Sequence, residues 1–213
     1  MDKQELALDE VLIQKEADAI RHEKSVRQDK DIINKLKEKE KNQKSISDYY
    51  QEIKNGFVQI DDTQFEIKLQ RFFNNALKVP IIADDIGSIE SREDFALVNY
   101  TNLETSLNLF YTKEKIAEIS HDVYQEAALR QAKQMGVMYE PVESGNIVSG
   151  NNTLIFSSAI TESEIGYLFC LSFYGGTVQS SLLGSFTCRL RKQYSYQNLF
   201  KAMMQCFYEM EEE

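Results

Sequence analysis

The feature that most constrains the fold of this chain is a nearly uncharged stretch, Tyr167 to Leu190, with the sequence YLFCLSFYGGTVQSSLLGSFTCRL. In a chain whose residues are 27% charged, this stretch carries a single charged side chain, Arg189. Its Gly, Ser, Thr and Gln residues interrupt it before an apolar run reaches the roughly 18–20 residues of a membrane helix. The stretch therefore does not predict a membrane span, and it indicates the core of a sheet.

The uncharged stretch divides into two strands of different character. In YLFCLSFY both sets of alternate residues are largely apolar, which predicts a central strand covered on both faces. Gly175-Gly176 fits the two-residue turn of a hairpin, which requires positive φ. The next strand alternates apolar and polar residues, so we expect it to be half-buried and to lie toward the sheet edge. Its polar side is a candidate partner-binding face formed by Ser185, Thr187, Arg189 and Arg191.

The same alternation predicts further strands, and two helices to cover them. Residues 105–111, the segments VMYEPV and TLIFSSAI, and the two strands above predict an antiparallel sheet with breaks at ESGNIVSGNN and TESE. Thr112 suits the N-cap of a helix that Gly136 ends. Its buried stripe would be Ile116, Ile119, Val123 and Ala127. A C-terminal helix is predicted to bury Leu199, Met203, Cys206 and Met210, and both helices are expected on one face of the sheet.

Residues 57–100 give a mixed pattern. FVQI and QFEIKL flank DDT and predict a hairpin. Pro80 disfavours a central strand, so residues 70–91 are interpreted as a loop with a short helical piece. Two interpretations stay open for the following segment, because Ser91 to Asp94 resembles a helix capping box while FALVNY alternates as a strand.

The first 55 residues differ from the remainder, since residues 2–55 contain no Pro or Gly and are rich in charge. They predict a separate charged helical region, 1–55, followed by an α+β domain, 56–213. A heptad row provides a candidate helix-interaction stripe of Leu12, Ala19, Val26 and Ile33. The partner positions His22 and Asp29 are polar, so a long helix that forms a homodimer and a helical hairpin both remain open. Ile46, Tyr50, Ile53 and Phe57 form an apolar stripe that would attach this region to the domain, with Gly56 at its C-cap.

Charge and cysteine content narrow the function classes. Residues 56–213 contain 12 basic and 21 acidic residues, a balance that disfavours nucleic acid as a partner. The three Cys are widely spaced, which predicts reduced, buried thiols rather than disulfides or a zinc site. The beginning of the chain has no signal-peptide pattern, so we expect a cytoplasmic protein. No nucleotide-binding, zinc-protease or serine-hydrolase motif occurs, and no catalytic, cofactor or metal residue is predicted.

The order of the predicted elements is similar to that of the DcrB/PsbP-like superfamily. The resemblance rests on the meander, on FYGGTVQSSLLGSFTC, and on the closing helix with LFKAMMQCF, and it covers residues 57–210. The Pro-Trp pair usual after the first strand of that family is absent, since the chain has no Trp. The resemblance implies an α/β/α sandwich without catalytic residues. Members of that superfamily bind proteins, and some act as chaperones for membrane-bound segments of bacterial secreted effectors.

The residues and the resemblance together predict a non-enzymatic protein-interaction module that needs no cofactor. The resemblance points to a chaperone or adaptor for a bacterial secreted effector. Two alternatives remain: a small-ligand-binding or hydrolytic domain with a cavity between sheet and helix, and a structural protein that oligomerises through a coiled coil.

Overall fold

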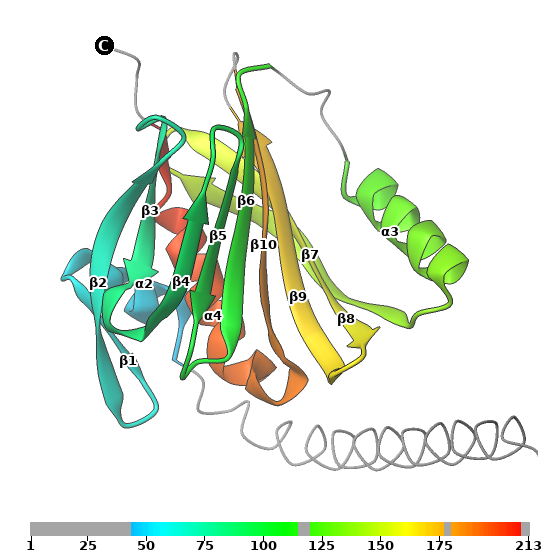
Figure 1. Cartoon of the computed structure of the whole chain (residues 1–213), viewed down its shortest axis with the longest axis horizontal. Helices are drawn as coiled ribbons and strands as arrows, with labels where there is room; N and C mark the ends of the chain where they lie inside the picture. Colours follow the sequence, from blue (N-terminus) through cyan, green and yellow to red (C-terminus); the bar gives the residue numbers. More distant parts are fainter. Residues whose placement is uncertain (1–43, 115–119, 177–179, 210–213) are drawn as a thin grey trace, which may run out of the picture.

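The computed structural model describes residues 44–114, 120–176 and 180–209. They form two antiparallel sheets arranged around a C-terminal helix (Figure 1), an α+β fold. The predicted interaction stripe of Leu12, Ala19, Val26 and Ile33 lies outside the described residues.

The larger sheet has seven strands in the order β4-β5-β6-β10-β9-β8-β7. Their bounds are β4 Ile86–Ser91, β5 Phe95–Tyr100, β6 Thr105–Thr112, β7 Tyr139–Ser149, β8 Asn152–Ser163, β9 Gly166–Gly176 and β10 Ser181–Arg189. The uncharged stretch supplies β9 and β10, and β9 lies inside the sheet as predicted. The cover predicted for both of its faces was wrong, because α4 lies on one side and no described helix lies over the other. The expectation that β10 lies toward the edge was wrong, because β6 pairs with β10 from Ser181 to Cys188 and makes it the middle strand.

The smaller sheet has the order β1-β2-β3-β11. Its strands are β1 Phe57–Ile60, β2 Thr63–Phe72, β3 Leu77–Ile82 and β11 Tyr208–Glu209. The predicted hairpin of β1 and β2 is confirmed. The predicted loop around Pro80 was wrong, since Pro80 lies within β3. Because β11 pairs only with Leu77 and Lys78, β3 is an edge strand at Pro80, where a residue without an N–H is tolerated. The short helical piece exists as the 3-10 turn η2, Ala83–Asp85.

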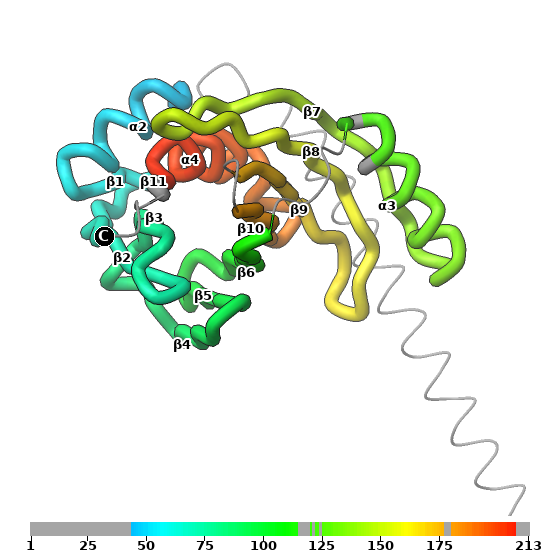
Figure 2. Tube along the Cα trace, turned by 90° about the horizontal axis from the view of Figure 1, so that it is seen from above, coloured from blue at the N-terminus to red at the C-terminus, as the bar shows by residue number. Residues whose placement is uncertain are grey.

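Helix α4, Gln193–Gln205, lies between the two sheets (Figure 2) and is buried on nearly all sides. Its Phe200 ring stacks on Phe186 of β10, with 4.6 Å between centroids. Helix α2, Ile46–Lys54, packs on α4 and begins with a capping box formed by Ser45 and Asp48. The C-terminal helix was predicted to continue to Met210. It ends at Gln205 because the chain turns to pair Tyr208 and Glu209 with β3.

Helix α3, His121–Met135, differs most from expectation. It begins after Ser120 rather than after Thr112, which ends β6. It packs on β7 and β8 only at the side of the molecule, and Val123 of the predicted buried stripe is 58% exposed. Ile116 and Ile119 lie outside the described residues. Gly136 does end the helix, with φ +68°.

The pair Gly175-Gly176 was predicted to form the hairpin turn, and this was wrong. Both glycines belong to β9 and pair with Leu182 and Ser181. The strand uses them for close packing instead, since a Cβ on Gly175 would lie 2.5 Å from Leu154 Cδ2. Of the two interpretations of FALVNY, the strand is correct, and it forms β5.

Candidate functional site

The seven-stranded sheet has an inner face toward α4 and an outer face on the opposite side. Inner residues such as Val98, Leu107 and Phe186 are fully buried against the core. On the outer face, α3 lies over β8, where Gln125 Nε2 donates to Ser157 Oγ at 3.3 Å. No described helix covers the outer face of β5, β6, β10 and β9 (Figures 1 and 2). We call this four-stranded area the open face.

An apolar row crosses the open face at right angles to the strands. Strand pairing places each member directly opposite the next. From β5 across to β8, the members are Phe95, Phe110, Leu183, Tyr174 and Ile155. The Phe95 and Phe110 rings are 5.0 Å apart between centroids. Phe110 is 52% exposed, and the others are half-buried. Such side chains on a sheet face without a helix present apolar surface to solvent.

Most of the remaining side chains of the open face are small and uncharged. One row runs from Leu97 through Asn108 and Ser185 to Ser172, and the next includes Thr187 and Cys170. Cys170 Sγ lies 3.7 Å from both Ser172 Oγ and Thr187 Oγ1. Within the described residues, Arg189 at the end of β10 is the one charged side chain on the open face.

The predicted site residues are only partly brought together. The open face carries Ser185, Thr187 and Arg189. Arg189 Nη1 donates to the carbonyl of Ile165, in the turn between β8 and β9. Arg191 lies outside this face, because β10 ends at Arg189 and a 3-10 turn, η3 (Leu190–Lys192), follows. Its guanidinium pairs with Glu104 at 2.5 Å, and this hydrogen bond lowers the pKa of the Glu104 carboxyl.

Sequence reasoning missed the apolar row. A signal existed in SLNLFYT, where Phe110 falls on the same side as Ser106 and Asn108. An aromatic residue on the polar side of a strand marks a position that local alternation does not explain. The alignment of Phe110 with Leu183 and Tyr174 depends on register between strands far apart in sequence.

Several buried ionisable side chains are held by ion pairs or hydrogen bonds, and others are thiols. Lys201 of α4 pairs with Glu143 of β7 at 2.6 Å, and its ammonium lies 5.0 Å from the centre of the Phe156 ring. The carboxylate of Asp85 accepts hydrogen bonds from the backbone of Asn102 and Leu103 and holds the β5–β6 turn. Burial raises the pKa of Cys188 and raises that of Cys206 to about 11, which disfavours reactive thiolates.

The described residues include a small hollow but no cluster of metal-binding side chains. A hollow at one end of α4, lined by Leu77, Leu154, Leu182 and Phe207 among others, offers about 10 Å³, the space of a single water molecule. Small-molecule sites are typically about 300 Å³ or more. Within residues 44–114, 120–176 and 180–209, no three His, Cys, Asp or Glu side chains gather at metal-binding distance. No helix in that part of the chain has the length and apolar character to cross a membrane.

Comparison with known proteins shows similarity in structure without similarity in sequence. No protein-family model and no curated protein sequence matches the chain. Cyanobacterial PsbP (CyanoP) from Synechocystis sp. PCC 6803 superimposes with a TM-score of 0.50 at 7% identity, over 68% of this chain and 92% of CyanoP. The α+β fold therefore resembles that of PsbP.

Two further solved structures are similar to a lesser degree. A protein from Bacteroides thetaiotaomicron VPI-5482 has a TM-score of 0.46 at 14% identity, over 70% of this chain and 50% of that one. Protein PA94 from Pseudomonas aeruginosa has a TM-score of 0.44 at 11% identity, over 68% of this chain and 99% of that one.

Proposed function

We propose that this protein is a non-enzymatic interaction module that holds a partner polypeptide on the open face. The observation that carries the proposal is a four-stranded sheet area with one charged side chain and no described helix over it. A sheet face in contact with water usually carries charged and polar residues. A face with Phe110 half-exposed and small hydroxyl residues beside it is suited to contact with protein.

The size of the open face agrees with this role. Four strands spaced about 4.8 Å apart, and about seven residues along each strand, span roughly 19 by 23 Å. The resulting area of roughly 400 Å², apolar along the row and mostly polar beyond it, is large enough for a short polypeptide segment. A partner segment that covers it would supply the cover that α4 supplies on the inner face.

The proposal is tested by exchanging one exposed ring. Phe110→Ser removes the most exposed member of the apolar row, whereas Leu69→Ser removes a side chain of equal exposure from β2 in the other sheet (52% and 53%). Affinity purification of tagged full-length protein from its source, with mass spectrometry, should recover a protein whose yield falls at least about tenfold with Phe110→Ser. An equal yield from both variants contradicts the proposal.

We further propose a chaperone or adaptor role in the cytoplasm, with a secreted effector as the partner. Its support is the resemblance of element order and fold to PsbP-like domains. Deletion of the gene should then shorten the lifetime of the recovered partner, as measured by pulse-chase labelling. A partner of unchanged lifetime and localisation contradicts this specific role.

A structural role for the N-terminal region is a second candidate, because the heptad row from Leu12 to Ile33 is of the kind that pairs helices. Helix α2 carries its own capping box at Ser45, so a chain that begins at Lys44 retains the start of the described fold. Light scattering of this truncated chain should show a monomer if the N-terminal region forms a homodimer. An unchanged mass contradicts that role.

A further inference from the structure

We propose that the open face selects a cationic amphipathic segment, one whose apolar side chains are flanked by Lys or Arg. This inference rests on the proposed function and adds the chemistry of the partner. The apolar row supplies the contact surface. The charges beside its Phe95–Phe110 end decide what that surface accepts.

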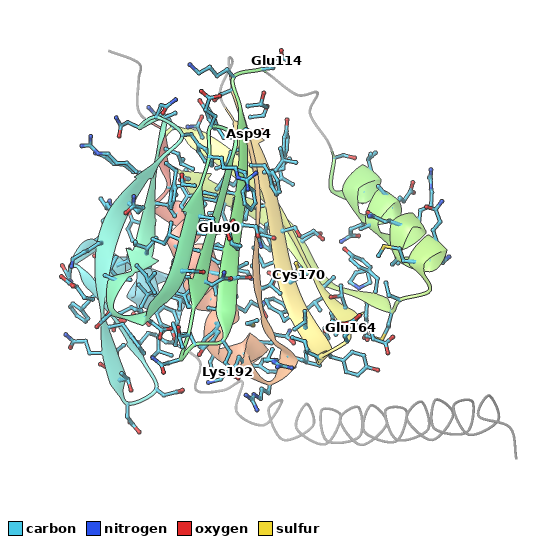
Figure 3. All side chains as sticks on the ribbon, in the orientation of Figure 1. Glu90, Asp94, Glu114, Glu164, Cys170 and Lys192 are labelled. Atoms are coloured by element: carbon cyan, nitrogen blue, oxygen red, sulfur yellow. The ribbon has the colours of Figure 1, made fainter. Side chains whose placement is uncertain are left out.

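Acidic side chains border this end of the apolar row. Glu90 on β4 lies directly opposite Leu97 of β5, Asp94 immediately precedes Phe95, and Glu114 follows the end of β6. Figure 3 shows these three acids along the β4–β5–β6 side of the sheet. The charged residues in and next to the β4–β5 turn and at the end of β6 are Glu90, Arg92, Glu93, Asp94, Lys113 and Glu114, and their net charge is −2.

The acids are available to a partner. Within the described residues, Glu90, Asp94 and Glu114 form no ion pair. The backbone fixes their positions, since the Asp94 carbonyl accepts from Tyr111 N at 2.9 Å and Glu114 N donates to Thr112 Oγ1 at 3.2 Å. A cation bound beside the Phe95–Phe110 end of the apolar row would be attracted by these carboxylates, and added salt would weaken that attraction.

The sign of this charge separates the possible classes of partner. We call the acidic residues Glu90, Asp94 and Glu114 the rim. Their negative charge repels nucleic acid and anionic lipid headgroups. An uncharged apolar segment gains from the apolar row but nothing from the rim. A segment with Lys or Arg beside its apolar residues gains from both, and residues 56–213 as a whole favour it, with 12 basic against 21 acidic residues.

Two synthetic peptides test the inference with the full-length protein. Both place leucine at helical spacing, and the remaining positions are lysine in one peptide and glutamate in the other. Isothermal titration calorimetry at low salt should detect binding of the leucine–lysine peptide only. Phe110→Ser should weaken this binding about tenfold or more. Glu90→Gln, Asp94→Asn and Glu114→Gln combined should weaken it about tenfold, with a smaller effect at high salt.

Matched controls distinguish the site from general attraction to an acidic protein. Leu69→Ser preserves the apolar row, and Asp62→Asn, Glu126→Gln and Glu140→Gln combined remove the same charge from exposed positions elsewhere. Both controls should bind the leucine–lysine peptide as the unaltered protein does. Equal weakening by the two charge variants, equal binding of the two peptides, or no binding overturns the inference.

The outcome for the natural partner separates this inference from the proposed function. If Phe110→Ser releases the natural partner while the three rim substitutions retain it, the open face is the site and the charge preference is wrong. If Phe110→Ser retains the natural partner, the proposed function itself fails at this face.

Discussion

Gly184 shows how one residue determines the packing of the sheet on α4. It lies on the inner face of β10, opposite Phe173 of β9, and the Phe173 ring extends across it. That ring makes an edge contact with Phe207, which follows α4, at 5.5 Å. The absence of a side chain at Gly184 therefore creates the space in which an aromatic cluster forms.

We predict that Gly184→Ala destabilises the fold. A Cβ there would lie 2.3 Å from Phe173 Cζ and 2.7 Å from the Asn108 carbonyl oxygen, so the ring must move. The free energy of unfolding in urea should fall by about 1–3 kcal/mol. Ser185→Ala, one residue along and on the outer face, is the control and should change it by less than about 0.5 kcal/mol. Equal effects of the two variants would contradict this account.

The buried pair of Lys201 and Glu143 is asymmetric. The Lys201 side chain is 6% exposed and the Glu143 side chain is 41% exposed. Loss of the lysine leaves a carboxylate that water can reach. Loss of the glutamate leaves an ammonium enclosed beside Phe156, and an unpaired buried charge is costly.

We therefore predict that Glu143→Ala destabilises the protein more than Lys201→Met. Urea unfolding should show a loss of about 2 kcal/mol for Glu143→Ala and less than about 1 kcal/mol for Lys201→Met. The double variant should resemble Lys201→Met, because no unpaired ammonium remains in it. A larger loss for Lys201→Met than for Glu143→Ala would refute this prediction.

At the level of elements, α4 and α3 have opposite roles. Helix α4 is enclosed by the two sheets and by α2, whereas α3 packs mainly on β7 and β8. The Val123 and Met135 side chains of α3 are 58% and 66% exposed. A helix with few buried contacts opens at a lower free energy than the core.

The rates of amide hydrogen exchange should therefore differ between the two helices. We expect amides of α3 to exchange far faster than those of α4, whose protection should approach the limit set by global unfolding. Native-state exchange followed by mass spectrometry measures both helices in one sample. Equal protection of α3 and α4 would show that α3 belongs to the same cooperative unit.

At the scale of the whole molecule, burial of ionisable groups makes stability depend on alkaline pH. Burial raises the pKa of Cys206 from 9.0 to about 11. Burial, followed by the charges of Glu52 and Asp61, raises the pKa of Tyr49 from 10.0 to about 12. Both groups remain protonated to higher pH in the folded chain, so the unfolded chain releases their protons first.

We predict that the free energy of unfolding falls as pH rises from about 9 to about 12, first through Cys206 and then through Tyr49. Cys206 alone should contribute a loss of about 1 kcal/mol by about pH 10. Urea unfolding at several alkaline pH values measures the slope, and Cys206→Ala should reduce it. A slope that is the same in Cys206→Ala would exclude this thiol as a cause.

Local patterns determined several elements of this protein from the sequence. Alternation in GSFTC gives a strand because a two-residue period places apolar side chains on one face, and the short apolar run YLFCLSFY gives a strand inside the sheet. Gly136 after a helical pattern gives a helix end because a left-handed residue there costs glycine little. The absence of charge between Tyr167 and Cys188 identifies the centre of a sheet, since charge is costly to bury.

Only the tertiary structure decided how these elements meet. Pro80 is tolerated in β3 because β11, near the C-terminus, pairs only with Leu77 and Lys78 and leaves that side of β3 without a partner at Pro80, while β2 pairs with the other side. Helix α3 lies outside the core because α4 and the second sheet already fill the inner face. The apolar row exists because register brings Phe110, Leu183 and Tyr174 into line from three strands. Period and composition act over a few residues, whereas pairing partners and register are set by contacts between distant segments.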